Sequence, residues 1–338
     1  MNNLDPKNVL GSTEMFPDQC EYIWDLSKSF QFPAEFKSAK AITICGMGGS
    51  RYGAYVARSL CWDQLKVPLL EYGDYHLPAY IDDKSLFILS SYSGGTEEPL
   101  SSAEEAIKRG TNIVGLTGGG QVLQMSKQYN FPALVFDQKY NPSNQPRLGT
   151  GFMVLGTLAI LTRLGYLQIS DEEVKNAVEE LRNNQEEIKN RAKELAGKLQ
   201  GYIPIVFAAQ HLVGNAHIIR NQLNETSKSF SAFEDIPELN HHLMEGLKNP
   251  MDKKLITLFL TSEYYSEKHQ KRIALTGDVI KQNGVDFLEY RPSGATKLSE
   301  VLNILSFGGF LTLYLAFLYG QDPSLIPWVD YFKEQLAK

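Results

Sequence analysis

The sequence has few cysteines, no surplus of basic residues and no long uninterrupted apolar run. Its 338 residues include three cysteines, Cys20, Cys45 and Cys61, whose spacing matches no metal site or disulfide framework. We therefore expect reduced thiols, which favour the cytoplasm. A formal net charge of -6 argues against binding of nucleic acid through a general basic surface.

Signals for export and for membrane insertion are also missing. Residues 1–11 contain Asp5 and Lys7 but no apolar core, so we expect no signal peptide. Two apolar stretches, 151–167 and 303–320, are interrupted by hydroxyl-bearing, charged or glycine residues and give no clean span of about 20 apolar residues. We expect two helices buried between a sheet and a neighbouring domain or subunit, with no membrane contact.

Three signatures of cofactor and metal sites are absent. No Gly-Lys-Ser/Thr follows a glycine loop, the full Gly-x-Gly-x-x-Gly pattern does not follow the apolar run 41–45, and no histidines are spaced as His-Glu-x-x-His. We therefore expect no nucleotide cofactor and no metal.

What the sequence does contain is an alternation of short apolar runs with helical patterns. The strand-like runs are 41–45, 68–72, 85–90, 112–116 and 133–136, then 202–208, 255–260 and 285–290, with a shorter segment at 232–235. Such alternation predicts parallel, doubly wound sheets. Between the two series, apolar residues repeat at helical spacing through the charged stretch 171–199. We predict an α/β fold of two α/β/α domains, 1–167 and 201–338, joined by a linking helix at 168–200.

Two loops rich in glycine and hydroxyl groups follow two of these runs. They are Gly46-Met47-Gly48-Gly49-Ser50 and Ser91-Tyr92-Ser93-Gly94-Gly95-Thr96. Each leads into a helical pattern, where unpaired NH groups and the helix dipole favour an anion. The hydroxyls of Ser91, Ser93 and Thr96 could donate to a phosphate, although an ordinary capped turn is an alternative for this loop alone. Because both loops lie beyond the carboxyl ends of strands, we expect them to meet at one crevice that binds a sugar phosphate.

Together the two loops resemble the phosphosugar-binding loops of the sugar isomerase (SIS) superfamily. Further motifs follow along the chain: Pro146-Arg147, Asn224-Glu225, Pro237-Glu238-Leu239-Asn240-His241, Gly320-Gln321-Asp322-Pro323 and Lys333. In this order they resemble the bifunctional phosphoglucose/phosphomannose isomerases over nearly the whole chain. The sequence departs from that family at Gly95, where Asn is usual, and at His242-Leu243, where Asn-Glu is usual.

The resemblance implies an aldose-ketose isomerase without a cofactor. Such an enzyme would interconvert glucose 6-phosphate and mannose 6-phosphate with fructose 6-phosphate through a cis-enediol. Two alternatives use similar loops: a non-catalytic module that senses a sugar phosphate, and an aminosugar-phosphate isomerase or deaminating enzyme. Assays on the different sugar phosphates would separate them.

The resemblance also implies roles for four charged or ionisable side chains. Glu225 would move the proton as the base, and the fixed charge of Arg147 would stabilise the enediolate. His241 would help to open the sugar ring, with Lys333 beside it. Without the resemblance, each would be taken for an exposed or structural side chain.

The binding groups and the assembly follow from the same resemblance. The residues expected to bind the substrate are Gly48, Gly49, Ser50, Ser91, Ser93, Thr96 and Ser324. Ser324 is the small hydroxyl residue that would let both C2 epimers enter. We expect a homodimer, because the two apolar helices offer more apolar surface than one small domain readily hides. The resemblance implies that His241 could reach the crevice of the partner.

Overall fold

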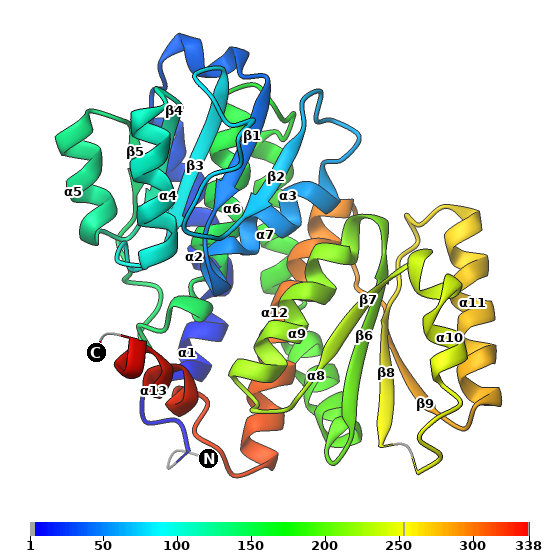
Figure 1. Ribbon diagram of the computed structural model, residues 1–338. Coiled ribbons are helices and arrows are strands. Elements are labelled where there is room, and N and C mark those ends of the chain that lie inside the picture. Colours follow the sequence, from blue (N-terminus) through cyan, green and yellow to red (C-terminus); the bar gives the residue numbers. More distant parts are fainter. Residues whose placement is uncertain (1–3, 253, 337) are drawn as a thin grey trace.

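The computed structural model describes residues 4–252, 254–336 and 338 of the chain. Within these residues it forms two parallel β-sheets with helices on both faces (Figure 1). The first sheet has five strands in the order β2-β1-β3-β4-β5, and the second has four in the order β7-β6-β8-β9. In each sheet the first strand along the chain lies inside, with later strands on either side of it. The predicted fold class, α/β with two doubly wound parallel sheets, is confirmed.

The first sheet separates two unequal cores. Its strands are β1 (Ala41–Cys45), β2 (Leu69–Tyr72), β3 (Ser85–Ser91), β4 (Asn112–Thr117) and β5 (Ala133–Val135). The helices around it are α2 (Phe16–Lys28), α3 (Tyr52–Leu60) and α6 (Thr150–Arg163) on one face, and α4 (Glu97–Lys108) and α5 (Gly120–Tyr129) on the other. Side chains alternate across the pleat. Ile44 and Ile88 therefore join the large core under α2, α3 and α6, whereas Cys45 and Leu89 join the smaller core under α4 and α5.

The second sheet is built in the same way. Its strands are β6 (Ile203–Ala209), β7 (Ala232–Ile236), β8 (Leu255–Leu260) and β9 (Asp286–Tyr290). Its helices are α8 (Gln185–Leu199), α9 (Val213–Glu225) and α12 (Lys297–Leu318) on one side, and α10 (Leu243–Gly246) and α11 (Glu267–Gln282) on the other (Figure 1). Since α9 follows β6 and returns along the sheet, it ends near the point where β7 begins. The Asn224 side chain fixes this by donating to the Ser231 carbonyl at 3.1 Å.

Helices α3 and α9 hold the two halves together. A Cβ atom at Gly214, near the start of α9, would lie 2.5 Å from the Tyr55 carbonyl oxygen, so a glycine allows this close approach. The Gly214 NH donates to Ser59 Oγ at 3.2 Å. Further along, the rings of Tyr55 and His217 stack with centroids 3.8 Å apart. This packing places α9, which ends at Glu225, beside the helix that follows the glycine loop.

Helix α12 is the apolar helix at the centre of the molecule. Its length and composition would allow it to cross a membrane, but most of it is buried against α7 (Asp171–Asn183), α8 and α9. The expected burial of this stretch is confirmed. The helix begins at Lys297 rather than near residue 303, because Thr296 Oγ1 accepts from the Ser299 NH at 3.1 Å. Glu300 is also buried, and its Oε2 lies 2.8 Å from His211 Nε2. Because a charged residue is not expected in a buried helix, the sequence placed the start of α12 too late.

The segment expected as one linking helix consists of two helices, α7 and α8, which are separated at Asn184. Ser170 caps α7 by accepting from the Glu173 NH at 3.0 Å. Helical hydrogen bonds continue at Asn184: its NH donates to the Glu180 carbonyl at 3.0 Å, and its carbonyl accepts from the Ile188 NH at 3.0 Å. The interruption is therefore confined to this one residue, whose Nδ2 donates to Ser293 Oγ at 3.2 Å.

Candidate functional site

The glycine loop and the serine loop meet at the carboxyl ends of β1 and β3. Cys45 and Leu89 are paired in the register of these strands, so both loops leave the sheet at one edge. Ser50 joins them: its Oγ accepts from the Tyr92 NH at 2.9 Å, and its carbonyl accepts from Ser90 Oγ at 2.6 Å. The structure thus brings the two loops together, as the sequence predicts.

Two positions of the glycine loop require glycine, each for a different structural reason. Gly48 has a φ of 51°, in the left-handed region that glycine adopts without steric cost. At Gly49 a Cβ atom would lie 2.9 Å from the Cα of Arg147. Gly49 therefore allows the backbone that carries Arg147 to come close to the glycine loop.

The serine loop presents hydroxyl groups at the start of α4. Ser91 Oγ lies 3.2 Å from Thr96 Oγ1 and accepts from the Gly94 NH at 3.1 Å. Ser93 is exposed, and its Oγ accepts a long hydrogen bond of 3.4 Å from the Gly95 NH. Thr96 is the N-cap residue of α4, yet its side chain caps no NH group of the helix. Its hydroxyl and the NH groups of the first turn are the donors that suit an anion.

Arg147 and Glu225 form an ion pair between the two halves of the chain. Arg147 is only 2% exposed, and one of its terminal nitrogens, Nη1, lies 3.2 Å from Glu225 Oε1. The same nitrogen donates to Gln145 Oε1 at 3.2 Å, and Nη2 donates to the carbonyls of Pro323 at 2.6 Å and Ser324 at 3.1 Å. A single guanidinium therefore links Gln145, the end of α9 and the segment before the last helix.

A cleft of about 670 Å³ opens beside this ion pair. The residues that line it are Gly48, Arg220, Asn221, Asn224, Glu225, Phe230, Ser231, Ala232, Phe233 and Val329. The cleft joins the glycine loop to the face of α9 that ends in Glu225, whose side chain is 30% exposed. A carboxylate that is open to a cleft on one side and paired with a buried cation on the other can exchange a proton with a bound ligand.

His241 lies away from this cleft in the same chain. It ends the short 3₁₀ helix Glu238–His241, which follows the carboxyl end of β7, and it is exposed. Glu225 lies at the opposite end of β7, where Asn224 contacts Ser231. Five residues of strand span roughly 17 Å, so this chain does not bring its own His241 to Glu225.

The predicted site includes two C-terminal residues: Lys333 lies near the cleft, and Ser324 lies near Arg147. Lys333 is exposed on α13 (Pro327–Leu336), four residues beyond Val329, which lines the cleft. Residues four apart share a helix face, so Lys333 is one turn further along that face. Ser324 is 2% exposed and its Oγ donates to Asp322 Oδ1 at 2.7 Å. Its hydroxyl is thus engaged within its own loop.

Two cationic residues near the cleft were not among the site residues predicted from the sequence. Arg220 lines the cleft on α9, and the helical spacing of residues 220, 221, 224 and 225 was the signal that could have revealed it. Lys228 Nζ donates to the Asp322 carbonyl at 2.7 Å and to the Thr226 carbonyl at 3.1 Å. Partial burial of the ammonium, with Arg147 nearby, lowers the pKa of Lys228 to about 8. Nothing in the sequence marks this lysine.

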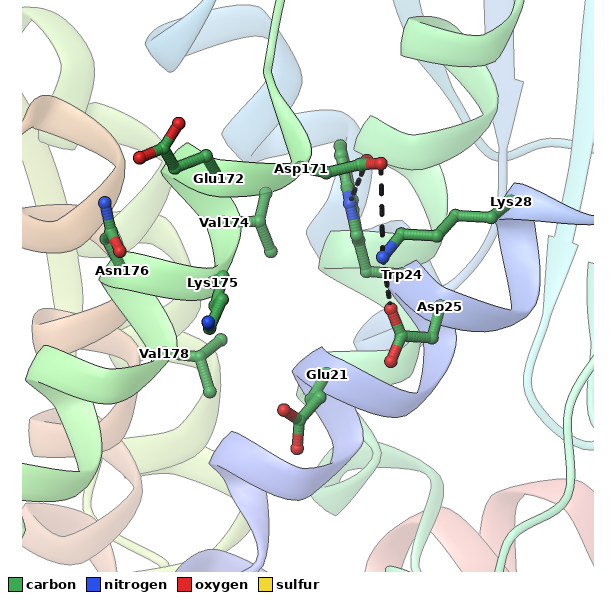
Figure 2. A pocket seen from close by; sticks show the side chains of 10 residues that line it. All are labelled: Glu21, Trp24, Asp25, Lys28, Asp171, Glu172, Val174, Lys175, Asn176 and Val178. Atoms are coloured by element: carbon green, nitrogen blue, oxygen red, sulfur yellow. Dashed lines mark hydrogen bonds and ion pairs between the residues drawn. The ribbon is translucent and has the colours of Figure 1, made fainter.

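A second groove, between α2 and α7, is not a candidate for the same site (Figure 2). It has a volume of about 450 Å³ and is lined by Glu21, Trp24, Asp25, Lys28, Asp171, Glu172, Val174, Lys175, Asn176 and Val178. Its polar groups largely satisfy one another: Trp24 Nε1 donates to Asp171 at 2.8 Å, and Lys28 pairs with Asp25 at 2.7 Å. The four acidic residues among its lining would repel a phosphate.

Comparison with known proteins agrees with the fold. A family model described as the bacterial phospho-glucose isomerase C-terminal SIS domain matches residues 188–336. The C-terminal domain of glucosamine-fructose-6-phosphate aminotransferase from Francisella tularensis superposes with a TM-score of 0.67 at 15% identity, covering 91% of this chain and 96% of that one. At this identity the likeness shows the fold, which is that of SIS domains.

Similarity in sequence extends over most of the chain. The bifunctional phosphoglucose/phosphomannose isomerase of Aquifex aeolicus is 31% identical, over 88% of this chain and 91% of its own. That of Caldicellulosiruptor bescii is 30% identical, over 95% of this chain and 97% of its own. Because these relatives are at least 30% identical to the chain over most of its length, the chain belongs to the family of bifunctional phosphoglucose/phosphomannose isomerases.

Proposed function

We propose that this protein is an aldose-ketose isomerase that interconverts glucose 6-phosphate and mannose 6-phosphate with fructose 6-phosphate. The observation that carries the proposal is the placement of Glu225, which opens on the same cleft as the glycine loop while Arg147 holds it at 3.2 Å. Membership of a family whose relatives bear this name supports it. No cofactor is needed, because the reaction only moves protons within one sugar.

The phosphate is expected to bind at the serine loop. Ser93 and Thr96 offer hydroxyls there, and the first turn of α4 offers NH groups that its own side chains do not cap. Ser91 is fully buried, and its Oγ lies 3.2 Å from Thr96 Oγ1, so it supports Thr96 from below. The joined glycine loop places Gly48 on the wall along which the sugar reaches Glu225, with Gly49 and Ser50 buried behind it.

Glu225 acts as the base of the proposed reaction. It removes the proton from C2 of the open-chain aldose, which gives a cis-enediolate. A proton then passes from O2 to O1, and Glu225 returns its proton to C1, which gives the ketose. The terminal nitrogens of Arg147 already donate to Gln145, Glu225 and the carbonyls of Pro323 and Ser324. Arg147 therefore stabilises the enediolate through its charge and holds the base in place.

Ring opening requires a proton donor that the protomer does not bring to its own cleft. His241 lies at the other end of β7, so we infer that a second copy of the chain supplies it, in a cytoplasmic homodimer. Exposed aromatic residues on α13, Trp328, Tyr331 and Phe332, lie on the helix that contributes Val329 to the cleft. Lys333 on this helix is the proposed partner of His241 in ring opening.

Residues 1–167 and 201–338 are the proposed domains.

Parallel turnover assays test the proposal. The purified protein is expected to convert glucose 6-phosphate and mannose 6-phosphate to fructose 6-phosphate, and to leave glucosamine 6-phosphate unchanged. Binding of all three without turnover would favour a sensor, and turnover of the aminosugar alone would favour the aminosugar enzyme. The double substitution Ser93→Ala with Thr96→Ala should raise KM for both hexose phosphates, because each lost bond to a charged group is worth about 1.5 to 3 kcal/mol.

A further inference from the structure

Arg220 is a cation that faces the cleft without a counter-charge. Among the described residues that line the cleft, it carries the positive charge, and Glu225 carries the negative charge. Glu225 pairs with Arg147, whereas Arg220 has no ion pair with any described acidic residue, and its buried Nε has no hydrogen-bond partner. An arginine with unused donors in a cleft is placed to meet a ligand, because an unpaired polar group costs free energy in the free protein.

Aromatic packing fixes where this charge lies. The guanidinium carbon of Arg220 is 5.3 Å from the centre of the Phe233 ring, which itself stacks on His217 at 4.4 Å. Burial, with Arg220 nearby, lowers the pKa of His217 to about 3, so this ring is neutral near pH 7. The other neighbouring cations are engaged elsewhere: Arg51 Nε donates to the Gly46 carbonyl at 2.7 Å, and Arg58 pairs with Glu71 at 2.9 Å.

The position of Arg220 relative to the base determines which part of a substrate it meets. Arg220 precedes Glu225 by five residues, which is about 7.5 Å along a helix axis. Both side chains face one cleft. A sugar phosphate that presents C2 to Glu225 therefore has C2 and its hydroxyl-bearing neighbours within reach of the long Arg220 side chain. Because Arg147 offsets the charge of Glu225, the uncompensated charge beside C2 is the positive charge of Arg220.

We propose that Arg220 determines specificity at this site, by donating to the hydroxyl groups of a hexose phosphate and disfavouring a substrate with an ammonium group at C2. The inference rests on the proposed isomerase function and extends it to the choice against aminosugar phosphates. A guanidinium has donors and no acceptor. A hydroxyl oxygen can accept from it, whereas an ammonium group brings a like charge and no free acceptor. Discrimination of this kind depends on a repulsive element as much as on an attractive one.

The test compares wild type with Arg220→Met on three ligands. KM for glucose 6-phosphate is measured together with the inhibition constants of glucosamine 6-phosphate and of 2-deoxyglucose 6-phosphate, which lacks both groups at C2. We expect KM for glucose 6-phosphate to rise roughly tenfold to a hundredfold, the range of one hydrogen bond to a charged group. The inhibition constant of glucosamine 6-phosphate should fall or stay the same. In wild type its inhibition should strengthen as pH rises through the pKa of its amino group, and Arg220→Met should lose this dependence.

Two further variants separate the effect of the Arg220 charge from the effect of replacing any arginine near α9. Arg220→Lys keeps the charge, so it should retain the pH-dependent exclusion of glucosamine 6-phosphate while KM for glucose 6-phosphate rises. Arg58→Met removes an arginine of α3 that pairs with Glu71 and does not line the cleft, and should change none of the constants. If Arg220→Met does not fold, Arg220→Gln gives the same comparison.

The possible outcomes distinguish this inference from the proposed function. An active wild type, with Arg220→Met or Arg220→Gln retaining the wild-type ratio of the two constants, would overturn the role of Arg220. A wild type that binds glucose 6-phosphate without turnover would refute the isomerase instead, and the same binding ratios would still decide whether Arg220 excludes the ammonium group.

Discussion

At the scale of single residues, the Arg147–Glu225 ion pair connects the two halves of the chain and also holds the proposed catalytic base. The two residues are 78 positions apart in the sequence, and Arg147 is buried while Glu225 is partly open to the cleft. Glycine and serine loops can be recognised locally, but nothing in the spacing of Arg147 and Glu225 predicts that they meet. The resemblance to a family identified both residues, and the structure adds the contact between them.

Glu225→Gln should abolish most turnover while sugar-phosphate binding persists. The amide keeps the size of the side chain but cannot accept the C2 proton, and acid-base groups contribute about 100- to 10,000-fold in rate. The measurements are kcat for both hexose phosphates and incorporation of deuterium at C2 in deuterated water, and both should fall together. Glu172→Gln is the matched control, because Glu172 is exposed in the first turn of α7 and lines the groove that is not a candidate for the site. Near-normal turnover of Glu225→Gln would remove Glu225 as the base.

His217 should make the protein less stable in mild acid. Burial lowers its folded-state pKa from 6.5 to about 3, so the unfolded chain binds a proton in this range that the folded chain does not. Stability is therefore lost as the pH falls below 6.5. A tenfold difference in proton affinity corresponds to about 1.4 kcal/mol, and after allowance for solvent screening of a partly exposed ring we expect a loss of about 1 kcal/mol between pH 6.5 and 5.

The substitution His217→Phe tests this directly. A phenyl ring can keep the stack between Tyr55 and Phe233 but cannot bind a proton. The difference in free energy of unfolding between pH 6.5 and pH 5, measured with urea, should be smaller in the variant. An equal pH dependence in both proteins would show that other groups cause it.

At the scale of elements, the sequence predicts the strands and the two loops well, because apolar runs and glycines are local signals. It predicts helix starts less well. Helix α12 begins six residues before the apolar stretch, since Lys297 and Glu300 interrupt the pattern although Glu300 is buried against His211. At the start of α12 a tertiary contact therefore overrides the local pattern. The break at Asn184 is a single residue at which helical hydrogen bonds continue, and the apolar repeat of residues 171–199 does not mark it.

Gly49→Ala should reduce turnover much more than Gly95→Ala. A Cβ atom at Gly49 would lie 2.9 Å from the Arg147 Cα, so the backbone beneath the ion pair must shift. At Gly95 a Cβ atom would meet nothing within 4 Å, and its φ is not in the left-handed region. Misplacement by about 1 Å can cost about a hundredfold in rate. We expect kcat to fall in this range for Gly49→Ala and to change little for Gly95→Ala. Comparable kcat values in the two variants would show that the approach at Gly49 is not required.

At the scale of the whole molecule, the parallel order of the second sheet is what separates the proposed catalytic groups. Because α9 runs back along the sheet, Glu225 and His241 must lie at opposite ends of β7. The exposed apolar side chains of α13 stand beside the cleft, with Trp328 81% and Phe332 64% exposed. A second copy of the chain would supply the histidine, and it would also cover apolar surface that a single copy leaves open.

Mixing two inactive variants tests this assembly. Glu225→Gln and His241→Ala should each lose activity alone, but a mixed dimer has one cleft with an intact Glu225 and an intact histidine from its partner. With free exchange of subunits, half of the dimers are mixed and each has one of two sites restored, so about a quarter of wild-type activity should return. A mixture of Glu225→Gln with Arg147→Met should recover none, because both changes affect the same cleft and neither mixed site is complete. If native mass spectrometry confirms mixed dimers of the first pair and no activity returns, each chain must use its own histidine, and the loop after β7 would then have to move to reach Glu225.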